Sequence, residues 1–132
     1  MADHRDDDGP ILVIDDDPHL RDAIARILEH EGHAVITAGD GPTAIEMTKA
    51  HAPGLLVLDY MLPEMNGEMI LGALREAIPD DVPPALLLTA CGEAFSRATQ
   101  MGCVIGLEKP FRIKELLAAV EQHRRKVATE RS

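Results

Sequence analysis

Short apolar runs, each leading into a polar side chain, are the feature of this chain that most restricts its fold. The runs are residues 11–14, 55–58, 86–88 and 104–107. The polar residues that they lead into are Asp15 and Asp16, Asp59, Thr89 and, through Glu108, Lys109. Apolar runs of this length, bounded by turn residues, are typical of strands buried on both faces of a parallel sheet. Because ligands of such sheets bind outside the carboxyl ends of the strands, we expect these side chains to meet at one edge.

Helix signals separate the apolar runs. Asp17 and Pro18 suit the N-cap and first turn of a helix that Gly32 ends. The other helices are expected at about 41–51, 67–78, 93–101 and 112–127, and a further short strand is expected at 34–37. That strand carries no reactive residue at its end. The alternation predicts one α/β domain with five parallel strands and helices on both faces of the sheet.

The last two helices differ in how firmly their sequences anchor them. The helix at 93–101 is short and weakly apolar, so we expect it to be the most mobile element. Its expected anchors are Phe95, Ala98 and Met101. In the final helix, the residues expected to face inward are Ile113, Leu116, Leu117 and Val120.

The ends of the chain suggest short tails around this domain. We expect an acidic flexible tail at 1–9, the domain at 10–127 and a C-terminal tail at 128–132. The chain lacks both a membrane-spanning apolar run and an apolar signal-peptide core, which predicts a cytoplasmic protein with no membrane partner. Cys91 and Cys103 have no metal-ligand spacing; we expect them to pack as thiols, with a disulfide as the lesser alternative.

The charge balance restricts the class of partner. The formal net charge is −10, and the only aromatic residues are Tyr60, Phe95 and Phe111. An acidic surface repels a phosphate backbone, and so few aromatic rings leave no platform for stacked bases. We therefore expect no direct binding of nucleic acid. A cation, or a protein with a basic patch, fits the charge better.

The polar residues at the strand ends suit a metal ion and a phosphoryl group. Asp15, Asp16 and Asp59 would repel one another unless a cation lies between them, and hard oxygen ligands suit Mg²⁺. Lys109 and Thr89 add an ammonium and a hydroxyl, which bind phosphoryl oxygens. Each residue also has an ordinary structural interpretation, such as a salt bridge or a local hydrogen bond. Together they favour a carboxylate that acts as nucleophile and forms an aspartyl-phosphate.

Four segments of the chain closely resemble the receiver domain of two-component response regulators. They are Ile11-Leu12-Val13-Ile14-Asp15-Asp16-Asp17-Pro18, Val57-Leu58-Asp59-Tyr60-Met61-Leu62-Pro63, Leu88-Thr89-Ala90 and Lys109-Pro110-Phe111. The resemblance runs from about residue 10 to residue 127. It implies a flavodoxin-like, doubly wound five-stranded sheet in the order 2-1-3-4-5.

The same resemblance implies roles for the site residues. Asp59 would be the phosphoacceptor, and Mg²⁺ would be bound by Asp16, Asp59 and the backbone carbonyl of Met61, with Asp15 acting through water. Thr89 and Lys109 would each hold a phosphoryl oxygen, and the Lys109–Pro110 peptide bond is often cis in this family. The donor would be a phosphohistidine on a sensor histidine kinase or a histidine phosphotransfer protein. The phosphorylated domain would then act on a downstream protein or pass the phosphoryl group on.

The sequence departs from the receiver pattern at Gly106, three positions before Lys109, where receivers usually carry an aromatic residue. One interpretation is that Gly106 only relaxes strand packing. We favour the other, that this receiver signals by another surface or passes its phosphoryl group on. Met61 and Cys91 are poor candidates for orienting a hydrolytic water, which predicts slow to moderate self-dephosphorylation.

Two other functions remain alternatives at this level. Asp15 and Asp17 mimic the Asp-x-Asp motif of a haloacid-dehalogenase-like phosphatase, but that family needs a further acidic strand end after the lysine. Only a helix is expected after Lys109. The second alternative is an interaction module that keeps the receiver fold without being phosphorylated.

Overall fold

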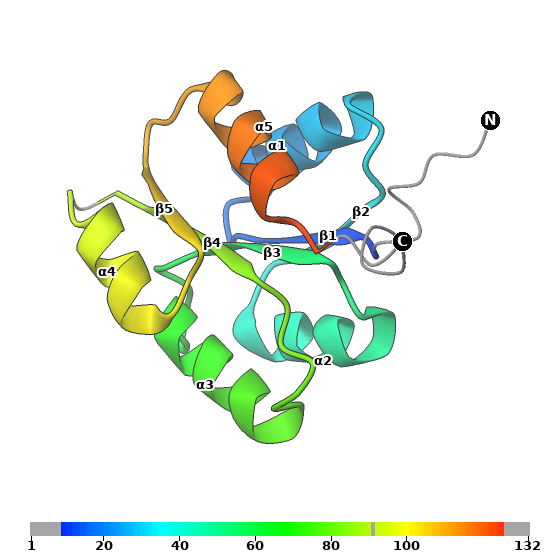
Figure 1. Cartoon of the computed structure of the whole chain (residues 1–132), viewed down its shortest axis with the longest axis vertical. Coiled ribbons are helices and arrows are strands. Elements are labelled where there is room, and N and C mark those ends of the chain that lie inside the picture. The colour runs from blue at the N-terminus through cyan, green and yellow to red at the C-terminus, as the bar shows by residue number, and fades with distance from the viewer. Residues whose placement is uncertain (1–8, 91, 126–132) are drawn as a thin grey trace.

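Five parallel strands form one sheet in the computed structural model, which describes residues 9–90 and 92–125 (Figure 1). The strands are β1 (Ile11–Ile14), β2 (Val35–Ala38), β3 (Leu55–Asp59), β4 (Ala85–Thr89) and β5 (Ile105–Glu108). The helices are α1 (Pro18–His30), α2 (Gly41–His51), α3 (Gly67–Ala77), α4 (Ala94–Met101) and α5 (Ile113–His123). The strand order is β2-β1-β3-β4-β5. The expected fold class and strand order are therefore confirmed.

The sheet separates two aliphatic cores, because successive residues of a strand point to opposite faces. In β1, Leu12 and Ile14 face the core that α2, α3 and α4 cover, whereas Ile11 and Val13 face the core under α1 and α5. Figure 1 shows these helices as two layers, one on each side of the sheet. All four β1 residues are buried, as are all five residues of β3 and of β4. The central strands are thus fixed from both sides.

Short polar side chains begin the first three helices. Asp17 accepts hydrogen bonds from the backbone N–H of His19, at 3.0 Å, and of Leu20. Asp40 caps α2 in the same way, and Asn66 caps α3. The N–H of Thr43 holds the pKa of Asp40 below its usual value. The predicted cap at Asp17 is confirmed, whereas Glu93, the residue before α4, makes no capping hydrogen bond with its side chain.

Two expected anchors point to solvent instead of the core. Phe95 is 83% exposed, because the buried positions of α4 are Ala94, Ala98 and Met101 and their helical spacing turns residue 95 outward. Ile113 is 54% exposed because it begins α5 beyond the edge of the buried core. These two inward-facing assignments were wrong, and those of Ala98, Met101, Leu116 and Val120 are confirmed.

The last helix ends earlier than expected. It stops at His123 rather than near residue 127, and Arg124 takes an extended conformation with ψ 146°. The backbone N–H of Arg125 then donates to the carbonyl of Gly54 at 2.8 Å. The proposed tails lie outside the described residues, except Gly9, as do Lys126 and Val127. No helix in the described ranges combines the length and apolar character needed to cross a membrane.

Candidate metal and phosphoryl site

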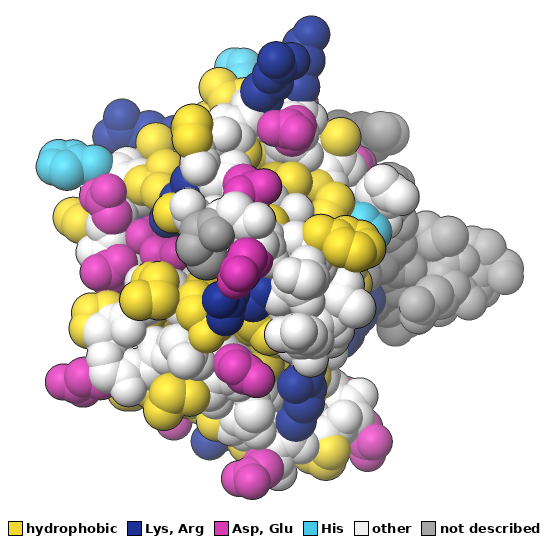
Figure 2. Space-filling view, turned by 90° about the vertical axis from the view of Figure 1, so that its left-hand side faces the viewer, with side chains coloured by type: hydrophobic (Ala, Val, Ile, Leu, Met, Phe, Trp, Pro, Cys, Tyr) yellow, Lys and Arg dark blue, Asp and Glu magenta, His cyan; other side chains and the backbone are white. Residues whose placement is uncertain are grey.

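Strand register brings the two buried carboxylates together. Ile14 of β1 pairs with Leu58 of β3, so the next residues, Asp15 and Asp59, lie side by side at the carboxyl edge of the sheet. The side chains of both are nearly inaccessible, with residue exposures of 1% for Asp15 and 6% for Asp59. Figure 2 looks onto this edge and shows acidic side chains gathered among hydrophobic ones. The apolar runs therefore hold two carboxyl groups in a buried position at this edge.

A third carboxylate completes an acidic cluster at this edge. Asp16 follows Asp15 and is exposed, and the carboxylate oxygens of Asp15, Asp16 and Asp59 lie within 4.8 Å of one another. One oxygen of each buried carboxylate is fixed by the backbone: Asp15 Oδ1 accepts from the N–H of Asp17 at 3.0 Å. Asp59 Oδ1 accepts from the N–H of Met61 at 3.3 Å. These bonds orient the carboxylates before any ligand arrives.

Lys109 lies between the two buried carboxylates. Its Nζ is 3.4 Å from Asp15 Oδ2 and 3.3 Å from Asp59 Oδ2. The backbone N–H of Lys109 donates to the carbonyl of Thr89 at 2.9 Å, and the Lys109–Pro110 peptide bond is cis, as the resemblance implied. The ammonium therefore lies where it can bind an oxygen of a group attached to Asp59.

Burial and charge together disfavour ionisation of Asp59. Loss of hydration on burial and the neighbouring Asp15 together raise the pKa of Asp59 to about 6, against the opposing effects of Lys109 and the Met61 N–H. One ammonium does not compensate for three carboxylates so close together. A divalent cation would, and its preference for oxygen ligands matches this donor set. The residues present thus fit Mg²⁺, with Asp16 and Asp59 the carboxylates best placed to bind it.

Thr89 and Met61 lie at the rim of the acidic cluster. Thr89 ends β4, one position beyond the residue that pairs with Asp59, and is 1% exposed. The residue after it, Ala90, is small and exposed, so the approach to Asp59 is open on that side. The side chain of Met61 points outward, at 68% exposure. Cys91 lies outside the described residues, and Cys103 is a half-buried free thiol whose pKa burial raises to about 11.

Two arginines near the site were missed by sequence reasoning. Arg21 of α1 donates to the backbone carbonyl of Asp15 at 2.9 Å, which steadies the turn that carries the acidic pair. Arg97 of α4 lies over the ring of Tyr60, with 4.2 Å from its guanidinium carbon to the ring centroid. Neither contact can be predicted from a local sequence pattern, because each joins residues of different elements. The spacing of Glu93 and Arg97 could have indicated only their ion pair within α4.

Comparison with known proteins decides the family. The family model of the response regulator receiver domain matches residues 11–121. The chain belongs to this family. Its fold and its acidic edge are therefore those of a receiver domain in two-component signal transduction. The family assignment does not support the phosphatase alternative.

The chain is similar to several curated proteins of bacteria. The transcriptional regulatory protein TrcR of Mycobacterium tuberculosis is 40% identical over 119 residues, which cover 87% of this chain and 46% of that protein. An uncharacterized 14.6 kDa protein of Leptolyngbya boryana is 37% identical over 115 residues, covering 86% and 88%. The chain thus spans about half the length of most of the curated relatives it matches and most of the length of the Leptolyngbya protein.

Solved structures agree with the fold. The receiver domain of NtrX from Brucella abortus superposes with a TM-score of 0.76 at 31% identity, covering 86% of this chain and 96% of that one. The chemotaxis protein CheY4 of Vibrio cholerae gives a TM-score of 0.77 at 26% identity, covering 86% and 97%.

Proposed function

We propose that this receiver domain accepts a phosphoryl group on Asp59 from a phosphohistidine in a Mg²⁺-dependent reaction. The observation that carries the proposal is the part-buried Asp59 carboxylate, 3.3 Å from Lys109 Nζ and within 4.8 Å of the carboxylate oxygens of Asp15 and Asp16. An anionic nucleophile needs nearby positive charge to receive an anionic phosphoryl group. Lys109 supplies one such charge and the acidic cluster supplies a place for another.

The ligands proposed for Mg²⁺ are Asp16, Asp59 and the backbone carbonyl of Met61, with Asp15 acting through water. Bound there, the ion would neutralise charge that develops on the phosphoryl oxygens. The raised pKa of Asp59 supports this assignment, because it reflects negative charge that the protein alone leaves uncompensated.

The transfer itself is an in-line displacement at phosphorus. A lone pair on an Asp59 carboxylate oxygen forms the new P–O bond, while the P–N bond to the donor imidazole breaks and leaves its electron pair on nitrogen. Lys109 and Thr89 each hold a phosphoryl oxygen in this scheme. Thr89 is drawn towards the phosphoryl group, and the connection to α4 moves with it. The domain then signals through that change or passes the phosphoryl group on.

An apolar groove beside Lys109 supports a protein donor. The groove has a volume of about 480 Å³ and runs between α1 and the segment that joins β5 to α5. Its lining residues are Leu20, Ala23, Ile24, Ile27, Lys109, Pro110, Phe111 and Ile113. A histidine kinase or histidine phosphotransfer protein seated there would lie next to the phosphoacceptor. Since this chain carries a formal net charge of −10, we expect the docking surface of that donor to be basic around an apolar centre.

We propose a protein as the direct downstream target. The relatives named as transcriptional regulators are about twice as long as the part that this chain matches. The acidic receiver domain itself is unsuited to a phosphate backbone. Any link to nucleic acid would therefore run through another protein or domain.

The exposed side chain of Met61 supports slow to moderate self-dephosphorylation. A thioether is a weak hydrogen-bond acceptor and no donor, so it does not orient a water molecule for attack on the phosphoryl group. We expect an aspartyl-phosphate half-life of many minutes or longer in purified protein with Mg²⁺. A half-life of seconds would contradict this expectation.

The test of the proposed function uses acetyl phosphate with Mg²⁺ and intact-protein mass spectrometry. The parent chain should gain one phosphoryl group, and Asp59→Asn should gain none. Asp22→Asn, an exposed carboxylate on α1, is the matched control and should behave as the parent does. If the parent takes up no phosphoryl group and does not respond to beryllofluoride, the non-phosphorylated interaction module becomes the better interpretation.

A second experiment addresses the docking groove. Ile113→Asp places a charge at an exposed position of the lining, where it should not disturb the core. We expect transfer from a phosphorylated histidine kinase that acts on the parent to slow by about tenfold or more, comparable to the loss of one interface hot spot. Labelling by acetyl phosphate should be unchanged. Equal slowing with both donors would instead locate the effect at the site itself.

A further inference from the structure

Helix α4 lies directly against the backbone of β5, at Gly106. A Cβ added to Gly106 would lie 2.8 Å from the carbonyl carbon of Ala94 and 3.0 Å from the Cβ of Ala98. The carbonyl oxygen of Ala94 would be closer still. No side chain fits at this position unless α4 moves. The glycine therefore does more than relax the strand: it creates the space that the first turns of α4 occupy.

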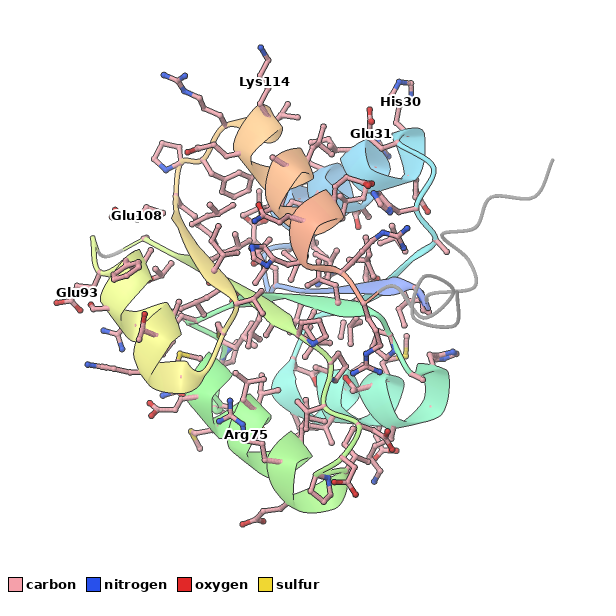
Figure 3. The ribbon with its side chains drawn as sticks, viewed as in Figure 1. His30, Glu31, Arg75, Glu93, Glu108 and Lys114 are labelled. Atoms are coloured by element: carbon pink, nitrogen blue, oxygen red, sulfur yellow. The ribbon has the colours of Figure 1, made fainter. Side chains whose placement is uncertain are left out.

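Two arginines fasten α4 in this position. Arg97 stacks on the ring of Tyr60 at 4.2 Å, and its guanidinium is also held by Glu93 at 3.0 Å. At the other end of the helix, Arg75 of α3 donates to the carbonyl of Met101 (Figure 3). The first contact thus joins α4 to the residue after β3, and the second joins it to α3, which Figure 1 shows on the same face of the sheet as α4.

The Tyr60 contact has a special position because Tyr60 directly follows Asp59. The backbone N–H of Tyr60 donates to the carbonyl of Leu88, which immediately precedes Thr89, and its carbonyl accepts from the N–H of Gly67 at the start of α3. The backbone that carries the Tyr60 ring is thus held by hydrogen bonds through both its N–H and its carbonyl. A helix that contacts this ring is tied to the immediate neighbourhood of the phosphoacceptor.

We propose that the Tyr60–Arg97 contact is a clamp that holds α4 against Gly106 and restrains the response of the domain to phosphorylation. The proposal rests on the proposed function, in which a phosphoryl group on Asp59 draws Thr89 and, with it, the start of α4. Because α4 fits so closely over Gly106, it cannot follow Thr89 without changing its contact with β5. That movement separates Arg97 from the fixed ring of Tyr60. The clamp therefore favours the unphosphorylated arrangement.

Reciprocity makes the clamp measurable. If the clamp lowers the population of the phosphorylated arrangement by some factor, it must weaken by the same factor the binding of a ligand that selects that arrangement. Beryllofluoride with Mg²⁺ is a stable mimic of the phosphoryl group. The side chain of Arg97 is only 27% exposed, and a half-buried cation–π contact has a strength that corresponds to about three- to tenfold in an equilibrium constant. Loss of the clamp should tighten beryllofluoride binding by that amount.

The first measurement is ligand-free hydrogen exchange of α4, followed by mass spectrometry. Arg97→Gln and Tyr60→Leu should each speed exchange of the α4 amides by about three- to tenfold, since an open helix is reached more often. Tyr60→Phe keeps the ring and should exchange as the parent does. Arg26→Gln, an exposed arginine of α1, controls for the loss of one positive charge. Unchanged exchange in both clamp variants would overturn the proposal.

The second measurement is the dissociation constant of beryllofluoride in the presence of Mg²⁺, obtained from the shift in unfolding midpoint. Arg97→Gln and Tyr60→Leu should each bind it about three- to tenfold more tightly, and the double variant no more tightly than either single one. Additive effects, or unchanged affinity, would show that the two residues do not act as a clamp.

The outcomes separate this inference from the proposed function. If the parent fails to bind beryllofluoride, the proposed function fails and the claim of coupling fails with it. If the parent binds it and the clamp variants bind it equally well, the phosphoacceptor assignment stands and only the clamp is wrong.

Discussion

The acidic edge and helix α4 are neighbours, yet they are held in place by different means. Asp15 and Asp59 directly follow strand residues that are fully buried in both cores, and their carboxylates are fixed by backbone N–H groups and Lys109. Helix α4 has eight residues, no side-chain cap, and a large apolar side chain turned to solvent at Phe95. The proposed phosphoryl chemistry is thus placed at the end of the most deeply buried strands. The proposed response to it involves a helix with far fewer buried side chains.

The largest expected contrast between the two regions is in stability. Leu58 is fully buried beneath Asp59, so Leu58→Ala should lower the free energy of unfolding by about 2–5 kcal/mol. Phe95→Ala on α4 removes a larger side chain that is 83% exposed, and should change the same quantity by no more than about 0.5 kcal/mol. Urea denaturation of both variants checks the prediction. Similar losses at the two positions would mean that α4 is packed as firmly as the central strands.

The next prediction concerns the charge held at the acidic edge. The folded-state pKa of Asp59 is about 6, above the usual 3.8, so ionising Asp59 destabilises the fold as the pH rises from about 4 to about 6. Asp59→Asn cannot ionise and escapes this penalty. At pH 7 without Mg²⁺, the variant should be more stable than the parent by about 3 kcal/mol.

The difference should shrink to near zero at pH 4, where Asp59 is protonated in the folded parent. Urea denaturation at the two pH values measures it, with Asp22→Asn as the exposed control. A variant that is less stable than the parent at pH 7 would show that Asp59 stabilises the fold through its contact with Lys109.

A smaller effect is expected from Mg²⁺ itself. At a concentration ten times its dissociation constant, the ion should stabilise the parent by about 1.4 kcal/mol. Asp16→Asn should lose most of this gain, because it removes a proposed ligand at an exposed position without disturbing the core. Thermal unfolding with and without Mg²⁺ checks both statements. Equal stabilisation of the two proteins would place the ion elsewhere.

The contrast between the acidic edge and α4 also explains which structural features could be predicted from the sequence. The position of Asp59 follows from a local pattern, since an apolar run buried on both faces must end at the edge of a parallel sheet. The cap at Asp17 is equally local, because its side chain bonds to backbone groups two and three residues away. The acidic cluster was therefore predictable, and so was the family.

The arrangement of α4 was not predictable in the same way. The contact between Tyr60 and Arg97 joins residues far apart in the chain, and the tight fit of Ala94 over Gly106 depends on how two elements pack in space. The exposure of Phe95 depends on which of several faces of a weakly apolar helix turns inward. Sequence periodicity leaves that choice open when small residues such as Ala94 and Ala98 carry the packing.

Gly54 gives the molecule a further property. Its N–H donates to the carbonyl of Pro10, and its own carbonyl accepts from the N–H of Arg125. Residues near both ends of the described chain are therefore hydrogen-bonded to one residue. That residue precedes β3, at the opposite end of the strand from Asp59. Surface immobilisation or fusion of a reporter near residue 9 or 125 would consequently leave the carboxyl edge of the sheet, which carries Asp59, facing outward. A reporter attached at either end would therefore lie away from Asp59, and the protein could serve as a sensor for the proposed phosphohistidine donor.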